Sequence, residues 1–213
     1  MKIIQNSILL VLFTSFSVLS QENDFQTWSS LSFKKKVVKK TDFTLKTGLR
    51  LRENSTLYSK QFFDLRLRTA LTKKLTLAAG YRYVTNWDKK LNISNLHRFY
   101  SDFIYKIKLV KRLRCSIRNR WQTQGDAYDY RMTLRQKFAL VYNVRKTKIT
   151  PNLATEYFLR LDNGINKLRS TISLSYPINK DLDFDLSYRI QQEFYVNNPE
   201  TLFILEGKIS YDL

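Results

Sequence analysis

The strongest constraint on the fold of this chain is an alternation of apolar and charged side chains at every second residue. In residues 41–54, TDFTLKTGLRLREN, one parity is apolar and the other carries charges: Phe43, Leu45, Leu49 and Leu51 against Lys46, Arg50 and Arg52. Successive side chains of a β-strand point to opposite faces of the sheet, so this strand has an apolar face and an ionic face. The apolar face can pack inside a protein or face lipid.

The same period of two recurs along most of the chain, and no window favours a helical period. It is present in residues 61–71, 75–84, 96–108, 113–122, 130–142, 149–160, 168–176, 182–194 and 202–213. Residues 25–33 are a weaker candidate strand. We therefore predict an all-β protein, an antiparallel up-and-down transmembrane β-barrel of ten to twelve strands. Because bacterial single-chain barrels have even strand numbers, we expect residues 25–33 to lie outside the regular wall or a twelfth strand to complete it.

Four features favour an apolar face turned toward lipid over a soluble barrel with the opposite orientation. The predicted strands of about 10–13 residues suit an outer membrane, whereas soluble strands average about 5–6. Outward aromatic residues gather near strand ends, as membrane interfaces favour. Small residues such as Gly48 and Gly80 are mixed with the inward arginines, as a crowded lumen requires. The last strand is aromatic at Tyr211 and resembles the signal read by the barrel-assembly machinery.

The predicted connections alternate in character. Short, mostly basic connections are expected at 72–74, 110–112, 143–148 and 177–181. Longer ones, richer in Asn, Asp and Gly, are expected at 53–60, 85–95, 123–129, 161–167 and 195–201. Short turns at one end and long loops at the other are typical of outer-membrane barrels.

The first twenty residues, MKIIQNSILLVLFTSFSVLS, have the features of a secretory signal peptide. One lysine precedes an apolar run, and small residues stand before Gln21. We predict cleavage after Ser20, with residues 1–20 as signal peptide and residues 21–213 as a single barrel domain in the outer membrane. The one cysteine, Cys115, excludes an internal disulfide.

The formal net charge of +19 indicates anionic partners. Nucleic acid is disfavoured, because the chain is expected to be exported and its charge is dispersed at period two rather than gathered in a patch. We expect outer-membrane lipids and small anions as partners. Basic turn residues are expected to contact lipid phosphates or to be solvated: Lys73, Lys74, Lys111, Arg112, Arg145, Lys146 and Lys180.

Several local strings resemble one family of exported proteins, the domain-of-unknown-function family 2490 of Bacteroidota. They are Phe25-Gln26-Thr27-Trp28, Gly80-Tyr81-Arg82-Tyr83, His97-Arg98-Phe99-Tyr100 with Asp102, Arg118-Asn119-Arg120-Trp121 and Glu156-Tyr157-Phe158. The resemblance implies a small outer-membrane-type barrel. It implies no activity, because it brings no catalytic or ligand residues.

The polar parity predicts a lumen rich in cations. Its predicted arginines are Arg50, Arg52, Arg66, Arg68, Arg82, Arg98, Arg114, Arg118, Arg120, Arg131, Arg135, Arg160, Arg169 and Arg189. Its predicted acidic partners are Asp64, Asp102, Glu156, Asp183, Asp185, Glu193 and Glu206. Two interpretations remain open: ion pairs plug a narrow barrel, or the excess of cations draws anions into it.

No motif for an enzyme or a cofactor stands out. The single histidine, His97, shares parity with Phe99 and is expected at the membrane interface, not in a hydrolase triad. One Cys and one His cannot build a zinc site, and no cofactor is predicted. We therefore expect no enzymatic activity, and a structural role or a narrow anion-preferring pore. The alternatives are a rim-active lipid hydrolase or deacylase and a soluble periplasmic barrel that binds an anionic ligand.

Overall fold

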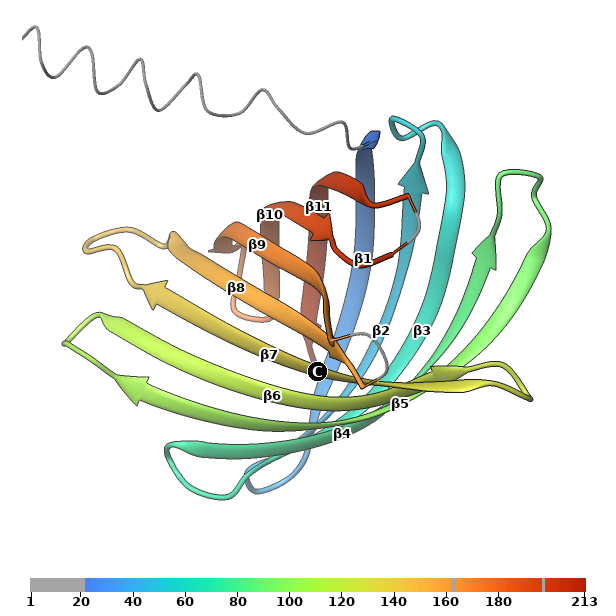
Figure 1. Ribbon diagram of the computed structural model, residues 1–213. Helices are drawn as coiled ribbons and strands as arrows, with labels where there is room; N and C mark the ends of the chain where they lie inside the picture. The colour runs from blue at the N-terminus through green and yellow to red at the C-terminus, as the bar shows by residue number, and fades with distance from the viewer. Residues whose placement is uncertain (1–21, 162–163, 197) are drawn as a thin grey trace, which may run out of the picture.

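The computed structural model describes residues 22–161, 164–196 and 198–213, and they form eleven β-strands (Figure 1). The predicted signal peptide, residues 1–20, lies outside the described residues. The strands are β1 (Glu22–Val38), β2 (Thr41–Arg52), β3 (Leu57–Ala70), β4 (Leu75–Trp87), β5 (Ile93–Lys108), β6 (Leu113–Gly125), β7 (Tyr130–Tyr142), β8 (Thr150–Arg160), β9 (Gly164–Pro177), β10 (Leu182–Glu193) and β11 (Glu200–Asp212). The prediction of an all-β barrel with ten to twelve strands is confirmed.

The sheet closes on itself through its first and last strands. Each strand from β1 to β11 pairs antiparallel with its neighbour in sequence, and β1 then pairs with β11 in parallel, from Glu22↔Glu200 to Lys34↔Asp212. Figure 1 shows these two strands side by side at the seam. The expectation for residues 25–33 is therefore wrong in both of its forms: they belong to a full wall strand, and no twelfth strand is needed among the described residues. An odd number of strands can close because the last pair is parallel.

The period of two decides which side chains face outward. Along β3, Leu65 and Leu67 are exposed outside the barrel, whereas Asp64 between Phe63 and Leu65 is buried inside it. The buried residues are mostly polar, and a small cluster of buried apolar side chains lies inside the wall: Trp28, Leu202 and Ile204. The barrel thus has a polar interior and an apolar outer surface, the reverse of a soluble protein.

Two inward glycines make room for aromatic rings on neighbouring strands. Gly48 of β2 is the cross-strand partner of Phe62, and Gly80 of β4 is the partner of Tyr100. A Cβ atom at Gly80 would lie 2.4 Å from the ring of Tyr100, and one at Gly48 would lie 2.7 Å from the ring of Phe62. The rings lie across the glycines, so the mixture of small and large inward residues is a packing requirement.

The two ends of the barrel differ in charge. The connections after β1, β3, β5, β7 and β9 form one end, called the turn end here: Lys39–Lys40, Leu71–Lys74, Leu109–Arg112, Asn143–Ile149 and Ile178–Asp181. They carry ten Lys and Arg residues and one acidic residue. The opposite end, called the loop end, carries the acidic residues Glu53, Asp88, Asp126 and Asp129 among its described residues.

The predicted difference in length between the two sets of connections is wrong. Both sets are short, because the arms of the loop-end hairpins continue beyond the alternating pattern. For example, β4 runs on to Trp87 and β5 begins at Ile93, within the predicted loop 85–95. No described segment is a helix of the length and apolar character that would cross a membrane.

Candidate functional site: the lumen

A cavity of about 1570 Å³ lies inside the barrel, and all eleven strands contribute to its lining. Its described lining residues include twenty Lys and Arg against eleven Asp and Glu, an excess of nine positive charges. A barrel of about this strand number is narrow, yet its side chains do not fill it. The lumen is therefore the candidate site for holding or passing a ligand, and it is cationic.

The structure places most of the predicted lumen residues around this cavity. Thirteen of the fourteen predicted arginines line it, and Arg114 does not: it is exposed near the turn end of β6. Six of the seven predicted acidic residues line it, whereas Asp102 is buried behind the cavity surface. Lysines on the same parity also line it: Lys46, Lys60, Lys137, Lys167 and Lys208.

Asp102 on β5 gathers two arginines from different strands. Arg120 on β6 donates from Nε to Oδ1 at 2.6 Å and from Nη2 to Oδ2 at 2.8 Å. Arg66 on β3 donates from Nη2 to Oδ2 at 2.7 Å and reaches across β4. The inward residues of β4 at this level are Ala78 and Gly80, which leave space for the bridge. The bidentate contact fixes the guanidinium of Arg120 on a fully buried carboxylate, and the single hydrogen bond from Arg66 ties β3 to the same group.

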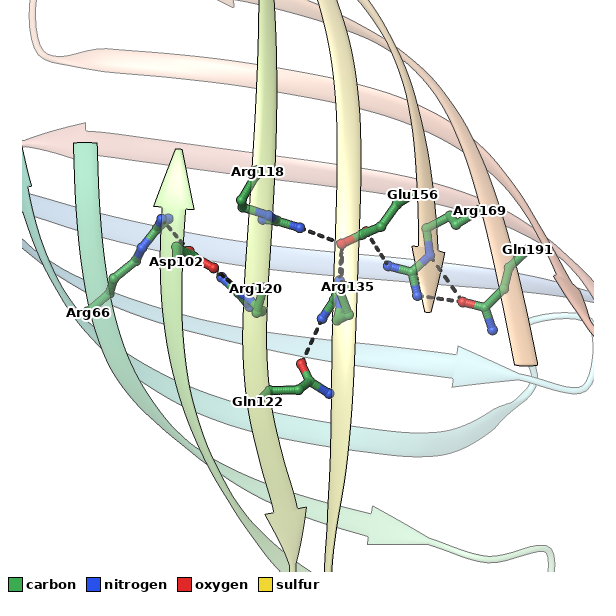
Figure 2. Close-up of polar contacts among 9 residues, drawn as sticks. All are labelled: Arg66, Asp102, Arg118, Arg120, Gln122, Arg135, Glu156, Arg169 and Gln191. Atoms are coloured by element: carbon green, nitrogen blue, oxygen red, sulfur yellow. Dashed lines mark hydrogen bonds and ion pairs between the residues drawn. The ribbon is translucent and has the colours of Figure 1, made fainter. Parts of the chain in front are cut away.

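Glu156 on β8 is the second centre of charge pairing, and Figure 2 shows it between three arginines. Its Oε1 accepts hydrogen bonds from Arg118 and Arg135, the latter at 3.0 Å, and Oε2 lies 3.8 Å from Arg169. Arg135 also donates to Gln122 at 3.1 Å. Arg169 also donates to Gln191 at 3.1 Å. A single carboxylate thus serves three cations, which leaves the group positive.

Glu206 on β11 is the third centre of charge pairing in the lumen. It pairs with Arg189 on β10 and lies 3.7 Å from Nζ of Lys46 on β2. The second contact spans β1, whose inward residues here include the small Ser30 and Ser32. We call the whole set the arginine–carboxylate belt: Arg66, Asp102, Arg118, Arg120, Arg135, Glu156, Arg169, Arg189, Glu206 and Lys46.

Inward aromatic rings contact several guanidinium groups of the lumen. The sequence analysis did not identify these aromatic residues as part of the lumen. Arg50 lies 3.7 Å from the ring centroid of Trp28, Arg120 lies 3.9 Å from that of Tyr100 and Arg82 lies 4.2 Å from that of Phe62. Arg135 and Arg169 flank Phe158 at 4.4 and 4.9 Å. The alternation of side chains could have identified them, because Phe62 has the same parity as the inward residue Asp64. In the same way, Phe158 has the same parity as Glu156. Stacking on aromatic faces orients a guanidinium and stabilises its charge.

His97 lies on the outer surface, away from the lumen. Its Nδ1 is 2.7 Å from Oη of Tyr81, and the ring centroids of Tyr83 and His97 lie 5.5 Å apart. No serine or threonine hydroxyl is hydrogen-bonded to it in the part of the chain that the structure describes. The same described residues contain no group of three or more His, Cys, Asp or Glu that could hold a metal ion.

Two loop-end carboxylates close turns at the mouth of the barrel. Asp88 accepts hydrogen bonds from the side chain of Asn92 at 2.7 Å and from the backbone amides of Asn92 and Lys90 at 2.8 Å. These bonds, that from the Asn92 side chain foremost, lower the pKa of Asp88. Asp126 accepts from the amides of Tyr128 and Asp129, which lower its pKa in the same way.

Comparison with known proteins bears on the fold and not on an activity. No curated protein and no solved structure matches the chain significantly. One family model does match, over residues 25–201, from β1 to the second residue of β11. This match confirms the resemblance noted from the sequence: the chain belongs to the family described as protein of unknown function, DUF2490.

Proposed function

We propose that this protein spans the outer membrane and that its lumen is a narrow, anion-preferring pore. The main support for this proposal is the combination of an apolar outer surface with a water-accessible cavity whose lining is strongly cationic. Rings of positively charged side chains select for anions in pores. The proposal assigns the chain no catalytic step.

The outer surface supports the membrane location. Leucine, isoleucine and phenylalanine side chains cover the middle of the wall, among them Leu45, Phe103 and Ile172. Such a surface is unfavourable in water by about 25 cal/mol per Å² of apolar area, whereas lipid covers it without cost. The strands have 11 to 17 residues, so each is at least as long as the roughly 9–11 residues that a tilted transmembrane strand needs.

Exposed aromatic residues supply the second support for this location. Trp121 and Tyr130 lie toward the loop end, and Tyr142, Tyr176 and Tyr211 lie toward the turn end. Aromatic side chains of this kind favour the two membrane interfaces. The basic turns at one end would then meet lipid phosphates.

The belt is the reason to test conduction directly. Its side chains point into the lumen from β2, β3 and the strands from β5 to β11, so a tightly paired belt would close the barrel and leave a structural role. The unfilled cavity and the surplus of nine cations support an open path for anions instead.

Purified protein in planar bilayers tests the pore. In a potassium chloride gradient, the reversal potential should shift from zero toward the equilibrium potential of chloride. Charge reversal at Arg52 and Arg131, which line the cavity outside the belt, should move the selectivity toward cations. Arg114→Glu is the matched control, because Arg114 does not line the cavity. Absence of any conductance in folded protein would refute the pore and favour the structural role.

Fractionation tests the location separately. The protein should remain with the outer membrane after carbonate extraction, and unheated samples should migrate differently from heated ones, as closed barrels do. Release by carbonate would favour the soluble periplasmic barrel.

A further inference from the structure

We infer that the loop-end half of the lumen contains a binding site for a doubly charged tetrahedral oxyanion, formed by Arg50, Lys60 and Arg98. Phosphate and sulfate represent this class. The inference deepens the proposed function, and it rests on the lumen being open to water and cationic.

These three cations differ from those of the belt because they lack carboxylate partners. Each arginine of the belt has at least one carboxylate oxygen within ion-pair distance. Among the described residues, no carboxylate lies within that distance of Arg50, Lys60 or Arg98, although all three line the cavity. Uncompensated charge in a confined space is unfavourable, and a bound anion compensates it.

The backbone register brings the three cations to one side of the lumen. Arg50 on β2 is the direct cross-strand partner of Lys60 on β3, and Arg98 on β5 is the partner of Arg82 on β4. Arg50 and Arg82 both lie over the ring of Phe62, at 5.6 and 4.2 Å from its centroid. Like charges placed directly opposite one another destabilise a sheet unless a counter-charge lies between them.

Arg50 is already oriented for binding. Trp28 stacks on its guanidinium group at 3.7 Å, and the indole Nε1 of Trp28 is itself fixed by a 3.0 Å hydrogen bond to Gln26. The buried Nε of Arg50 has no hydrogen-bond partner among the described residues. A buried donor that is left without a partner is costly, so a ligand oxygen that bonds to this group would remove an unfavourable feature of the lumen wall.

Arg98 and Lys60 supply complementary donors. Gln124 accepts hydrogen bonds from Nε and Nη2 of Arg98, which holds this guanidinium without neutralising it. The planar fork of an arginine matches two oxygens of an oxyanion, and a lysine adds a mobile point charge. Three positive charges around one site favour a dianion over chloride.

The ligand is soluble and not a lipid headgroup. Continuous strands separate the cavity from the outer apolar surface, and the three cations lie between the belt and the loop end. An anion therefore reaches them through the aqueous mouth, which Asn54 and Asp88 border.

Isothermal titration of the detergent-solubilised full-length protein tests the site with inorganic phosphate and sulfate, at constant ionic strength in sodium chloride. Both anions should bind with one site per barrel. Arg50→Gln, Lys60→Gln and Arg98→Gln should each weaken phosphate binding at least tenfold, whereas Arg114→Gln should leave it within twofold. Folding of each variant is checked by its migration on unheated gels; if Arg50→Gln does not fold, the Lys60 and Arg98 variants decide.

Two results would overturn the site. One is wild-type protein that binds no phosphate above the chloride background. The other concerns Arg68, a cation that lines the cavity on the turn-end side of the belt. If Arg68→Gln weakens phosphate binding as much as Arg50→Gln does, binding follows the overall charge of the lumen and not a site. Phosphate binding without ionic current in bilayers would refute the pore but support the site. Current without phosphate binding would refute the site alone.

Discussion

The carboxylate of Asp102 accepts two parallel hydrogen bonds from the guanidinium of Arg120, and its side chain has no exposed surface. The ring centroid of Tyr100 lies 3.9 Å from the guanidinium carbon of Arg120. The pair joins β5 to β6, and Arg66 extends it to β3. Charge pairing inside this barrel therefore takes the place of an apolar core and connects strands that are not neighbours.

Asp102→Ala should be strongly destabilising. The substitution leaves the buried guanidinium of Arg120 and the partly exposed guanidinium of Arg66 without their carboxylate. Breaking one side of a buried ion pair costs roughly 3–5 kcal/mol. The measurement is urea unfolding in detergent, followed by gel migration without heating. Asp212→Ala is the matched control, because the Lys34–Asp212 pair is half exposed and worth about 0–1 kcal/mol. Equal losses in the two variants would contradict a structural role for the belt.

Gly80→Ala should destabilise the barrel through steric overlap. The new methyl group would lie 2.4 Å from the ring of Tyr100 and 2.7 Å from the carbonyl oxygen of Leu65. Since a backbone atom is involved, the wall has to shift, at a cost of roughly 1–3 kcal/mol. Gly207→Ala is the control, because the nearest atom to its added methyl is 3.9 Å away. The same unfolding assay should show a change at Gly80 that far exceeds the change at Gly207.

Spin labels at Leu45, Leu67 and Phe138 should report lipid. All three side chains are exposed on the outer face of the wall. In reconstituted vesicles, dissolved oxygen should relax these labels strongly and an aqueous nickel reagent should not. A label at Thr44, which lines the cavity, should show the opposite preference. Outer-face labels that respond to nickel in vesicles, or that are immobilised in detergent-free buffer, would contradict the membrane location.

The turn between β4 and β5 should respond to acid. Because hydrogen bonding lowers the pKa of Asp88, its carboxylate stabilises the turn above the ordinary value of 3.8, and this stabilisation is lost as the pH falls through the lower folded-state pKa. A side-chain NMR titration should give a midpoint below 3.8, and Asn92→Ala should raise it. A wild-type midpoint at or above 3.8 would contradict the assigned hydrogen bonds.

The alternation of side chains predicted most of the fold and much of the lumen. It assigned Arg66 and Arg135 to the interior and Leu67 and Phe138 to the exterior, because a strand offers only two faces. It was less successful at strand ends, where the loop-end hairpins continue past the pattern. It also passed over Phe62, Tyr100 and Phe158, which share the inward parity but differ chemically from their charged neighbours.

The sequence by itself determined the all-β fold, the positions of most turns and the face on which each side chain lies, because these follow from the local period of two. Only the tertiary structure decided that β1 closes the wall in parallel with β11, that Asp102 reaches Arg66 across β4, and that Arg50 lies beside Lys60 without a carboxylate. Those relationships depend on register and on barrel closure between residues far apart in the chain, and a local pattern carries no information on either.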